Sequence, residues 1–176
     1  AAWQAHIQQL VVRAGYLNQK QYSALKYTGP GTNLTVGLPR GHIWRSAGFT
    51  SQGGIPFIAN IPTEEIFTLP DRGFAEGTVR ASMPLNYGGT LIEDFSLTLS
   101  GGKVVDFSAG RGAELLRSML ETDEGSRRFG EVALVPHSSP ISQSKLLFYN
   151  TLFDENAASH IALGRAYRFS LEGGVE

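Results

Sequence analysis

The chain has 176 residues, of which 41% are apolar and 18% are charged, and its formal net charge is −1. This length allows one core and at most a small second lobe, and the balanced charge gives no field that would hold nucleic acid or an anionic membrane. No apolar run approaches the ~20 residues that cross a bilayer, and no basic-then-apolar leader opens the sequence. We therefore expect a cytoplasmic protein without a nucleic-acid or membrane partner.

The sequence contains no cysteine. A disulfide framework, a thiolate nucleophile, a thiolate zinc site and an iron–sulfur cluster are thereby excluded. Any metal must be held by carboxylates and imidazoles, and the chain offers only four histidines. Carboxylate-rich ligation suits catalytic metals better than closed structural sites.

In the first half of the chain, helical signals give way to strand signals. Apolar residues at helical spacing predict a helical hairpin or one broken helix over residues 2–27, and Gly29-Pro30-Gly31 is a strong stop. The alternation and turn signals that follow predict a turn at 39–42 and strands over 32–36, 78–83, 91–99 and 104–107. The last two strands should form a hairpin around Gly101-Gly102.

In the second half, helical and strand signals are mixed. They predict helices over 112–122, over 123–128 and in the latter half of 146–164, and a short buried strand over 131–136. Strands and helices do not alternate as βαβ units, and no repeat is present. The sequence therefore predicts an α+β fold, with a mixed or antiparallel sheet and flanking helices.

Glu131 stands against its local pattern, because it opens an otherwise apolar strand between Gly130 and Val132. A carboxylate that enters a buried strand is costly unless a cation meets it. The simpler interpretation is a strand-end glutamate paired with Arg127 or Arg128. The alternative is a ligand to a metal ion.

Glu64 and Glu65 form a second anomaly, since they lie between Ile61 and the apolar pair Ile66-Phe67. Thr63 could cap a short helix whose first turn favours acidic residues. This structural interpretation and a functional one both remain open from the residues alone.

The third anomaly is the polar cluster before Ile161. On a helix, Asn156 and His160 would lie on one face because they are four residues apart, and the small residues 157–159 would allow a metal or another backbone to approach. A lone histidine beside apolar residues is also often a satisfied core residue. We interpret the other histidines, His6, His42 and His137, as non-ligands.

These three anomalies lie within strings that resemble one known family. The strings are NIPTEEIFT (60–68), GEVALVP (130–136) and LFDENAASHIALG (152–164), and in this order and spacing they resemble the thermophilic metallo-aminopeptidases. That family includes aminopeptidase S, aminopeptidase T and the PepS-type enzymes. The resemblance extends from Trp3 to about Tyr167.

The resemblance implies an exopeptidase that removes N-terminal residues from peptides with two divalent metal ions, which could be zinc, cobalt, magnesium or manganese. The family's metal ligands fall on Glu65, Glu131 and His160, which would come from a loop, a strand start and a helix. Glu155 and Tyr167 fall on positions associated with catalysis. We assign Glu155 as the general base and Tyr167 as a hydrogen-bond donor to the oxyanion.

The resemblance also implies a larger protein, which is a cytoplasmic homodimer with an N-terminal α/β domain. Residues 1–28 would be a helical segment that links to that domain, and residues 29–176 would be the catalytic domain. The family's remaining ligands come from a His-x-Asp pair, which this chain lacks, so we expect weak metal binding and an inactive chain. The competing hypotheses are a non-catalytic structural or dimerisation fragment and a small β-rich binding module.

Overall fold

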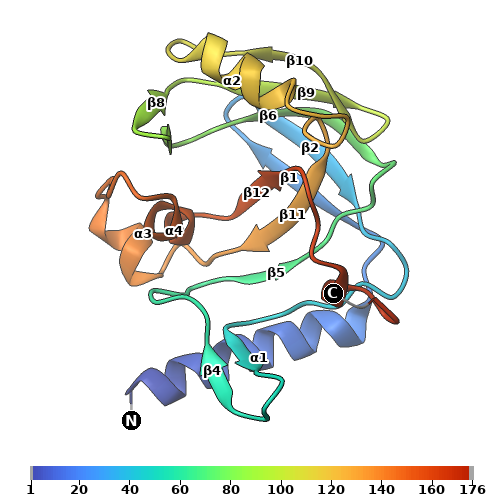
Figure 1. The fold of residues 1–176 in the computed structure, drawn as a ribbon, viewed down its shortest axis with the longest axis vertical. Coiled ribbons are helices and arrows are strands. Elements are labelled where there is room, and N and C mark those ends of the chain that lie inside the picture. The colour runs from blue at the N-terminus through green and yellow to red at the C-terminus, as the bar shows by residue number, and fades with distance from the viewer. Residues whose placement is uncertain (1, 175–176) are drawn as a thin grey trace.

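The computed structural model describes residues 2–174, and two antiparallel sheets form its frame (Figure 1). The larger sheet has the order β1-β2-β6-β9-β10 and the smaller one the order β12-β11-β5. The strands of the larger sheet are β1 (Ala24–Gly29), β2 (Thr32–Gly37), β6 (Ala75–Arg80), β9 (Ser96–Ser100) and β10 (Lys103–Ser108). Those of the smaller sheet are β5 (Ile66–Thr68), β11 (Phe129–Leu134) and β12 (His160–Leu163).

Two hairpins and several helices complete the fold. The hairpins are β3 (Gly48–Thr50) with β4 (Pro56–Ile58), and β7 (Leu85–Tyr87) with β8 (Thr90–Ile92). The helices are α1 (Ala2–Lys20), α2 (Ala113–Leu120), α3 (Pro140–Ser144), α4 (Thr151–Asp154), and the short 3₁₀ turns η1 (Glu155–Ala157) and η2 (Arg168–Ser170). In Figure 1, α2 lies over the larger sheet, α1 runs along the opposite end of the molecule, and α3 and α4 lie beside the smaller sheet. The predicted α+β fold is confirmed.

The core lies where both sheets and two helices turn apolar side chains inward. Leu34 and Val36 of β2 have no exposed surface, because alternate residues of a strand face the same side. Leu116 and Leu120 of α2 are four residues apart on one helical face and are equally buried. The apolar stripe of α1 packs inward beside β5 and buries Leu10.

Several local predictions are confirmed. The strand predicted at 32–36 is β2, the helix predicted at 112–122 is α2, and the strand predicted at 131–136 lies within and just beyond β11. The hairpin around Gly101-Gly102 joins β9 to β10. Both glycines have positive φ, of 58° and 72°, which a tight turn needs and other residues rarely adopt.

The second part of the predicted helical region 2–27 is wrong. One helix runs unbroken through Gly15 to Lys20, and the chain then enters strand β1. The stop at Gly29-Pro30-Gly31 is the turn of a hairpin, since Ala24–Gly29 pairs with Thr32–Gly37 across it. Pairing with β2 thus overrides the weak helical pattern of residues 22–27.

Two further boundaries differ from the predictions. The strand predicted at 91–99 is divided into β8 and β9, because Asp94 has a φ of 48° and Glu93 forms a bridge with Arg111. The helix predicted at 123–128 is a turn, in which the Asp123 carboxylate accepts hydrogen bonds from the N–H groups of Gly125 and Ser126. Such side-chain bonds to the backbone favour turns over helices.

The helix predicted to carry both Asn156 and His160 is also wrong. Helical structure ends at Ala157, and His160 is the first residue of strand β12. The hydroxyl of Ser159 accepts a hydrogen bond from the Val135 N–H at 3.2 Å, which joins this segment to the end of β11. The predicted strand at 78–83 lies three residues earlier, as β6.

None of the helices within residues 2–174 combines the length and the hydropathy that a bilayer-spanning helix needs.

Candidate metal centre

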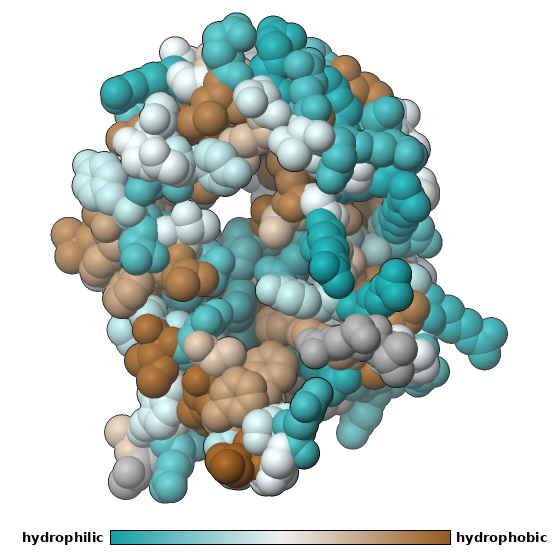
Figure 2. All heavy atoms as spheres, viewed as in Figure 1, coloured by the Kyte–Doolittle hydropathy of each residue, from teal (hydrophilic) through white to brown (hydrophobic). Residues whose placement is uncertain are grey.

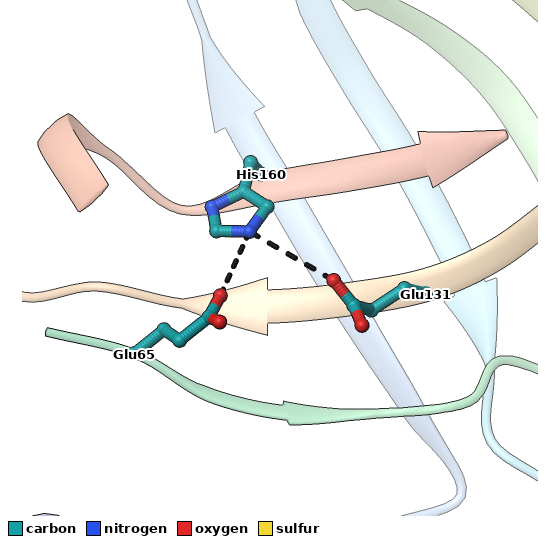
Figure 3. A group of neighbouring side chains, drawn as sticks. All are labelled: Glu65, Glu131 and His160. Atoms are coloured by element: carbon teal, nitrogen blue, oxygen red, sulfur yellow. Dashed lines mark ion pairs between the residues drawn. The ribbon is translucent and has the colours of Figure 1, made fainter. Parts of the chain in front are cut away.

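Three of the predicted site residues converge on one point, although they come from distant parts of the chain (Figure 3). Glu65 lies just before β5, Glu131 lies within β11, and His160 opens β12. One ligand atom from each residue lies within 4.8 Å of the other two. His160 Nε2 is 2.9 Å from Glu65 Oε2 and 3.9 Å from Glu131 Oε1.

The register of the smaller sheet produces this convergence. Strand β11 lies between β5 and β12, and its Ala133 pairs with Phe67 on one side and with His160 on the other. Glu65 and His160 therefore come to the same end of the sheet. Glu131 reaches them from the central strand, two residues before Ala133.

A bulge in β11 helps to direct Glu131. The register with β12 shifts between Phe129 and Glu131, so that Gly130 is an extra residue in β11. A Cβ atom on Gly130 would lie 2.6 Å from the carbonyl oxygens of Gly164 and Arg165. Only glycine allows this close approach, which explains its position directly before a site residue.

The polar atoms at the centre lack the partners that burial normally requires. The buried atoms Glu65 Oε2 and His160 Nε2 lie 2.9 Å apart as an ion pair, but they are not aligned for a hydrogen bond and neither has another hydrogen-bond partner. The other ring nitrogen, Nδ1 of His160, donates to the Ala158 carbonyl at 3.0 Å. This bond leaves the Nε2 lone pair free in neutral histidine, which is the form that binds metals.

Burial and mutual charge perturb the protonation of the cluster. Burial, with the nearby charge of Glu65, raises the pKa of Glu131 to about 7. Burial alone would lower the pKa of His160, but its contact with Glu65 outweighs burial and raises that pKa to about 9. In the metal-free chain the His160 imidazolium is the one cation that meets the two carboxylates within the described residues, and the remaining negative charge is repulsive. A divalent cation would relieve the repulsion, so the donor set fits a metal ion.

The purely structural interpretations of these acidic residues are wrong. Arg127 pairs with Glu121, and Arg128 donates to backbone carbonyls such as that of Arg72, so neither neutralises Glu131. Residues 63–65 form an irregular segment, and Thr63 caps no helix there. Both carboxylates therefore enter the interior without an arginine or a helix start to explain them.

Asn156 positions the loop that carries Glu65. It is 1% exposed, its Oδ1 accepts from the Glu64 N–H at 2.7 Å, and its Nδ2 donates to the Leu152 carbonyl at 2.9 Å. His6 of α1 holds the other side of this loop through a 2.7 Å bond to the Thr63 carbonyl. The sequence singled out Asn156 as polar among small residues, but nothing in it linked His6 to the site.

Glu155 borders the same space as the cluster. A cavity of about 450 Å³ is lined by Glu131, Glu155 and His160 on one side and by apolar residues such as Leu97 and Met119 on the other. In Figure 2 the molecule is hollowed between the part formed by α2 and β8 and the part formed by α3 and α4. Burial, followed by the charge of Glu65, raises the pKa of Glu155 to about 7.

Tyr167, the remaining predicted residue, lies in an aromatic cluster next to β5. Its ring stacks on Phe169 at 5.1 Å between centroids and meets Phe67 edge-on at 6.4 Å. The residue is 58% exposed. Phe67 follows Glu65 by two residues, so the cluster adjoins the metal-binding loop.

Comparisons with known proteins agree with the geometry. The model of the family described as thermophilic metalloprotease (M29) matches residues 1–176. Aminopeptidase 2 of Geobacillus stearothermophilus is 55% identical over 175 residues, and Aminopeptidase AmpS of Bacillus subtilis (strain 168) is 53% identical over the same length. Among solved structures, wild-type AmpT from Thermus thermophilus matches with a TM-score of 0.94 at 51% identity.

The matched region is only part of these relatives. The alignments cover 99% of this chain but 42% of Aminopeptidase 2 and 43% of AmpS. The structural match covers 98% of this chain and 43% of AmpT. The chain thus spans less than half of the length of the relatives that it matches.

Proposed function

Because the chain belongs to the thermophilic metalloprotease (M29) family, we propose that it forms the metal-binding part of a metal-dependent aminopeptidase. The observation that carries this proposal is the convergence of Glu65, Glu131 and His160, in which the buried Glu65 Oε2 and His160 Nε2 make no hydrogen bond. The relatives that match over nearly the whole chain are named aminopeptidases. The substrates would be peptides with a free N-terminus.

We propose that these three residues supply protein ligands to two divalent ions, which could be zinc, cobalt, magnesium or manganese. Two carboxylates and one neutral imidazole are donors that all four ions accept. Glu65 and Glu131 each have a second carboxylate oxygen, so either side chain can bridge a pair of ions. Bound divalent ions would supply an activated water and polarise the scissile carbonyl.

Glu155 is suited to proton transfer in this proposal. Its carboxylate borders the same cavity as Glu131 and His160, so a substrate in the cavity would lie beside it. Its pKa of about 7 lets it take a proton from the attacking water and then give one to the leaving amine. Its carboxylate oxygen would hold the proton between these two steps.

Tyr167 would donate a hydrogen bond from its hydroxyl to the tetrahedral oxyanion. Its position beside Phe67 and the loop of Glu65 supports this role. Its ring contacts also fit a structural role in the aromatic cluster. Tyr167→Phe keeps those ring contacts and removes only the hydroxyl, so turnover of this variant, in a protein of the relatives' full length, tells the two roles apart.

The proposal extends to the whole protein. By analogy with the family, it would be a homodimer that works in the cytoplasm. Of the apolar stripe of α1, Leu10 and Ala14 are buried in the chain's own core, whereas Trp3 and Val11 are 38% and 45% exposed. The grouping of Glu65, Glu131 and His160 is what favours the catalytic interpretation over a dimerisation fragment.

Calorimetric titration with Zn²⁺ and Co²⁺ tests the proposal on this chain. We expect binding that falls by about 100-fold or more in Glu65→Ala, Glu131→Ala and His160→Ala, because each removes a direct ligand. His137→Ala is the matched control, since His137 is exposed and bonded to Ser142, and it should bind like the unchanged chain. Equal affinity in all four variants would contradict the proposal.

A further inference from the structure

Strand β12 has a free edge that begins at a candidate metal ligand. Within residues 2–174, β12 pairs with β11 alone, and its other edge has no strand beside it. Proteins usually cover or blunt such edges with prolines, lysines or bulges, because an open edge pairs with other chains. Residues 160–163 are His-Ile-Ala-Leu and contain none of these protective features.

The hydrogen bonds of β5 reveal which backbone groups point to this edge. Phe67 exchanges both of its backbone bonds with Arg45, at 2.8 and 3.0 Å, so its groups point away from β11. Ala133, opposite Phe67, must therefore bond to His160 on its other side.

Alternation then fixes the next residues along the strand. The pair Val132 and Ile161 is a non-bonded pair, so the N–H and C=O of Ile161 point to the free edge. The Gly164 N–H donates to the Arg128 carbonyl at 2.7 Å, towards β11, which turns the groups of Leu163 outward as well. The N–H and C=O groups of Ile161 and Leu163 are therefore free to bond to another strand along this edge.

This edge belongs to a strand that borders the cavity. Residues Ala158 to Leu163 all line the cavity of about 450 Å³, together with Glu131 and Glu155. The opposite wall includes Val79, Phe95 and Leu97. The volume lies within the range of small-ligand sites, and one extended peptide segment could enter where a whole sheet edge could not.

We propose that the main chain of the peptide substrate binds along β12 as an added, parallel strand. This inference rests on the proposed function and specifies how the substrate is held. The substrate's N-terminal residue must lie at the metal centre, and His160 marks that end of β12. The peptide then runs in the same direction as β12, past Ile161 and Leu163. Main-chain bonds would supply affinity for many sequences, while the apolar wall favours peptides with apolar residues.

Amide exchange measured by NMR tests this binding mode in the Zn²⁺-loaded chain. The probe is pentaleucine with a reduced first peptide bond, which cannot be hydrolysed and keeps the carbonyls of its second and fourth residues as acceptors for the amides of Ile161 and Leu163. At ten times its Kd, exchange of the Ile161 and Leu163 amides should slow about tenfold. The amide of Ala162, which already points to β11, is the internal control and should not change. The same pentapeptide with an acetylated N-terminus should give no protection, because its N-terminus is blocked.

A variant pair tests the same contact from the protein side. Ile161→Pro removes the N–H that points to the edge but no bond to β11, and proline is tolerated in edge strands. Ile161→Val keeps that N–H and is the matched control. We expect Ile161→Pro to weaken binding of the probe about two- to tenfold, as for the loss of one hydrogen bond, with Zn²⁺ affinity unchanged in both variants.

The outcomes separate this inference from the proposed function. If Zn²⁺ binds but the Ile161 and Leu163 amides keep their exchange rates with the probe present, the inference is wrong and the proposed function stands. Protection of both amides without the probe, in a chain of the relatives' full length, would show that another segment covers the edge and would also overturn it. If the chain without any substitution does not bind Zn²⁺, the proposed function and this inference are both wrong.

Discussion

The larger and the smaller sheet are both antiparallel, but they differ in the side chains that they place in the interior. The larger sheet buries apolar side chains such as Leu34, Val36 and Leu99, each at most 2% exposed. The smaller sheet also buries Val132 and Ala133, but it brings two carboxylates into its interior, where His160 lies 2.9 Å from Glu65 and 3.9 Å from Glu131. Burial of apolar area stabilises a fold, whereas burial of unpaired polar groups destabilises it. Both sheets contribute apolar side chains to the core, and the smaller one additionally holds a charged cluster, which costs stability in the metal-free chain.

The contrast predicts that a core substitution in the larger sheet lowers stability and leaves Zn²⁺ affinity unchanged. Leu99→Ala should cost about 2–5 kcal/mol, through lost burial and the void that remains. Urea unfolding measures this cost, and calorimetry should find the Zn²⁺ affinity of the folded variant unchanged. A loss of Zn²⁺ affinity comparable to that of a ligand variant would show that the two sheets are not separable in this way.

Replacing Asn156 should lower both stability and Zn²⁺ affinity, because its side chain is buried beside the smaller sheet and holds the loop of Glu65. Asn156→Ala leaves the Glu64 N–H without its partner and should cost about 2–3 kcal/mol. It should also lower Zn²⁺ affinity by about 10–100-fold, as positioning residues of metal ligands do.

Asn150→Ala is the control for this prediction. Asn150 caps α4 through a 3.1 Å bond to the Leu152 N–H, on the helix whose Leu152 carbonyl also accepts from Asn156, whereas the bond to the Glu64 N–H comes from Asn156. Loss of this cap should cost about 1 kcal/mol and leave Zn²⁺ affinity unchanged. Equal effects of the two variants on Zn²⁺ would refute the positioning role of Asn156.

The larger sheet was the more predictable half, because its signals are local. Alternation in 32–36 and the pair Gly101-Gly102 specify a strand and a hairpin within a few residues. The exception is the strand over 24–29, whose pattern is weak and whose pairing with β2 decides the outcome.

At the site, the residue types were predictable, but their local structure was not. Glu65, Glu131 and His160 stood out as polar residues against apolar patterns, and the structure brings them together. The sequence places His160 in the helix predicted for the latter half of 146–164. Its strand conformation depends on contacts with β11 and Val135, which are distant in sequence. The contact of His6 with the loop is equally non-local.

The smallest expected effect has the opposite sign to the others. Glu131 carries a charge that burial opposes, and its pKa in the folded chain is raised to about 7. The metal-free chain is thus penalised as pH rises from the unfolded pKa through 7, and the penalty is absent at low pH, where Glu131 is protonated in both states. Glu131→Gln should therefore stabilise the metal-free chain by about 1–2 kcal/mol at pH 8, and by almost nothing at pH 4.

Urea unfolding of both chains in a metal chelator, at pH 4 and pH 8, measures this difference. Glu121→Gln is the control, because Glu121 is exposed and should change stability by less than about 0.5 kcal/mol at either pH. A destabilised Gln variant at pH 8 would mean that the Glu131 charge is already compensated inside the chain. In that case the smaller sheet would have no need of a cation, and its contrast with the larger sheet would disappear.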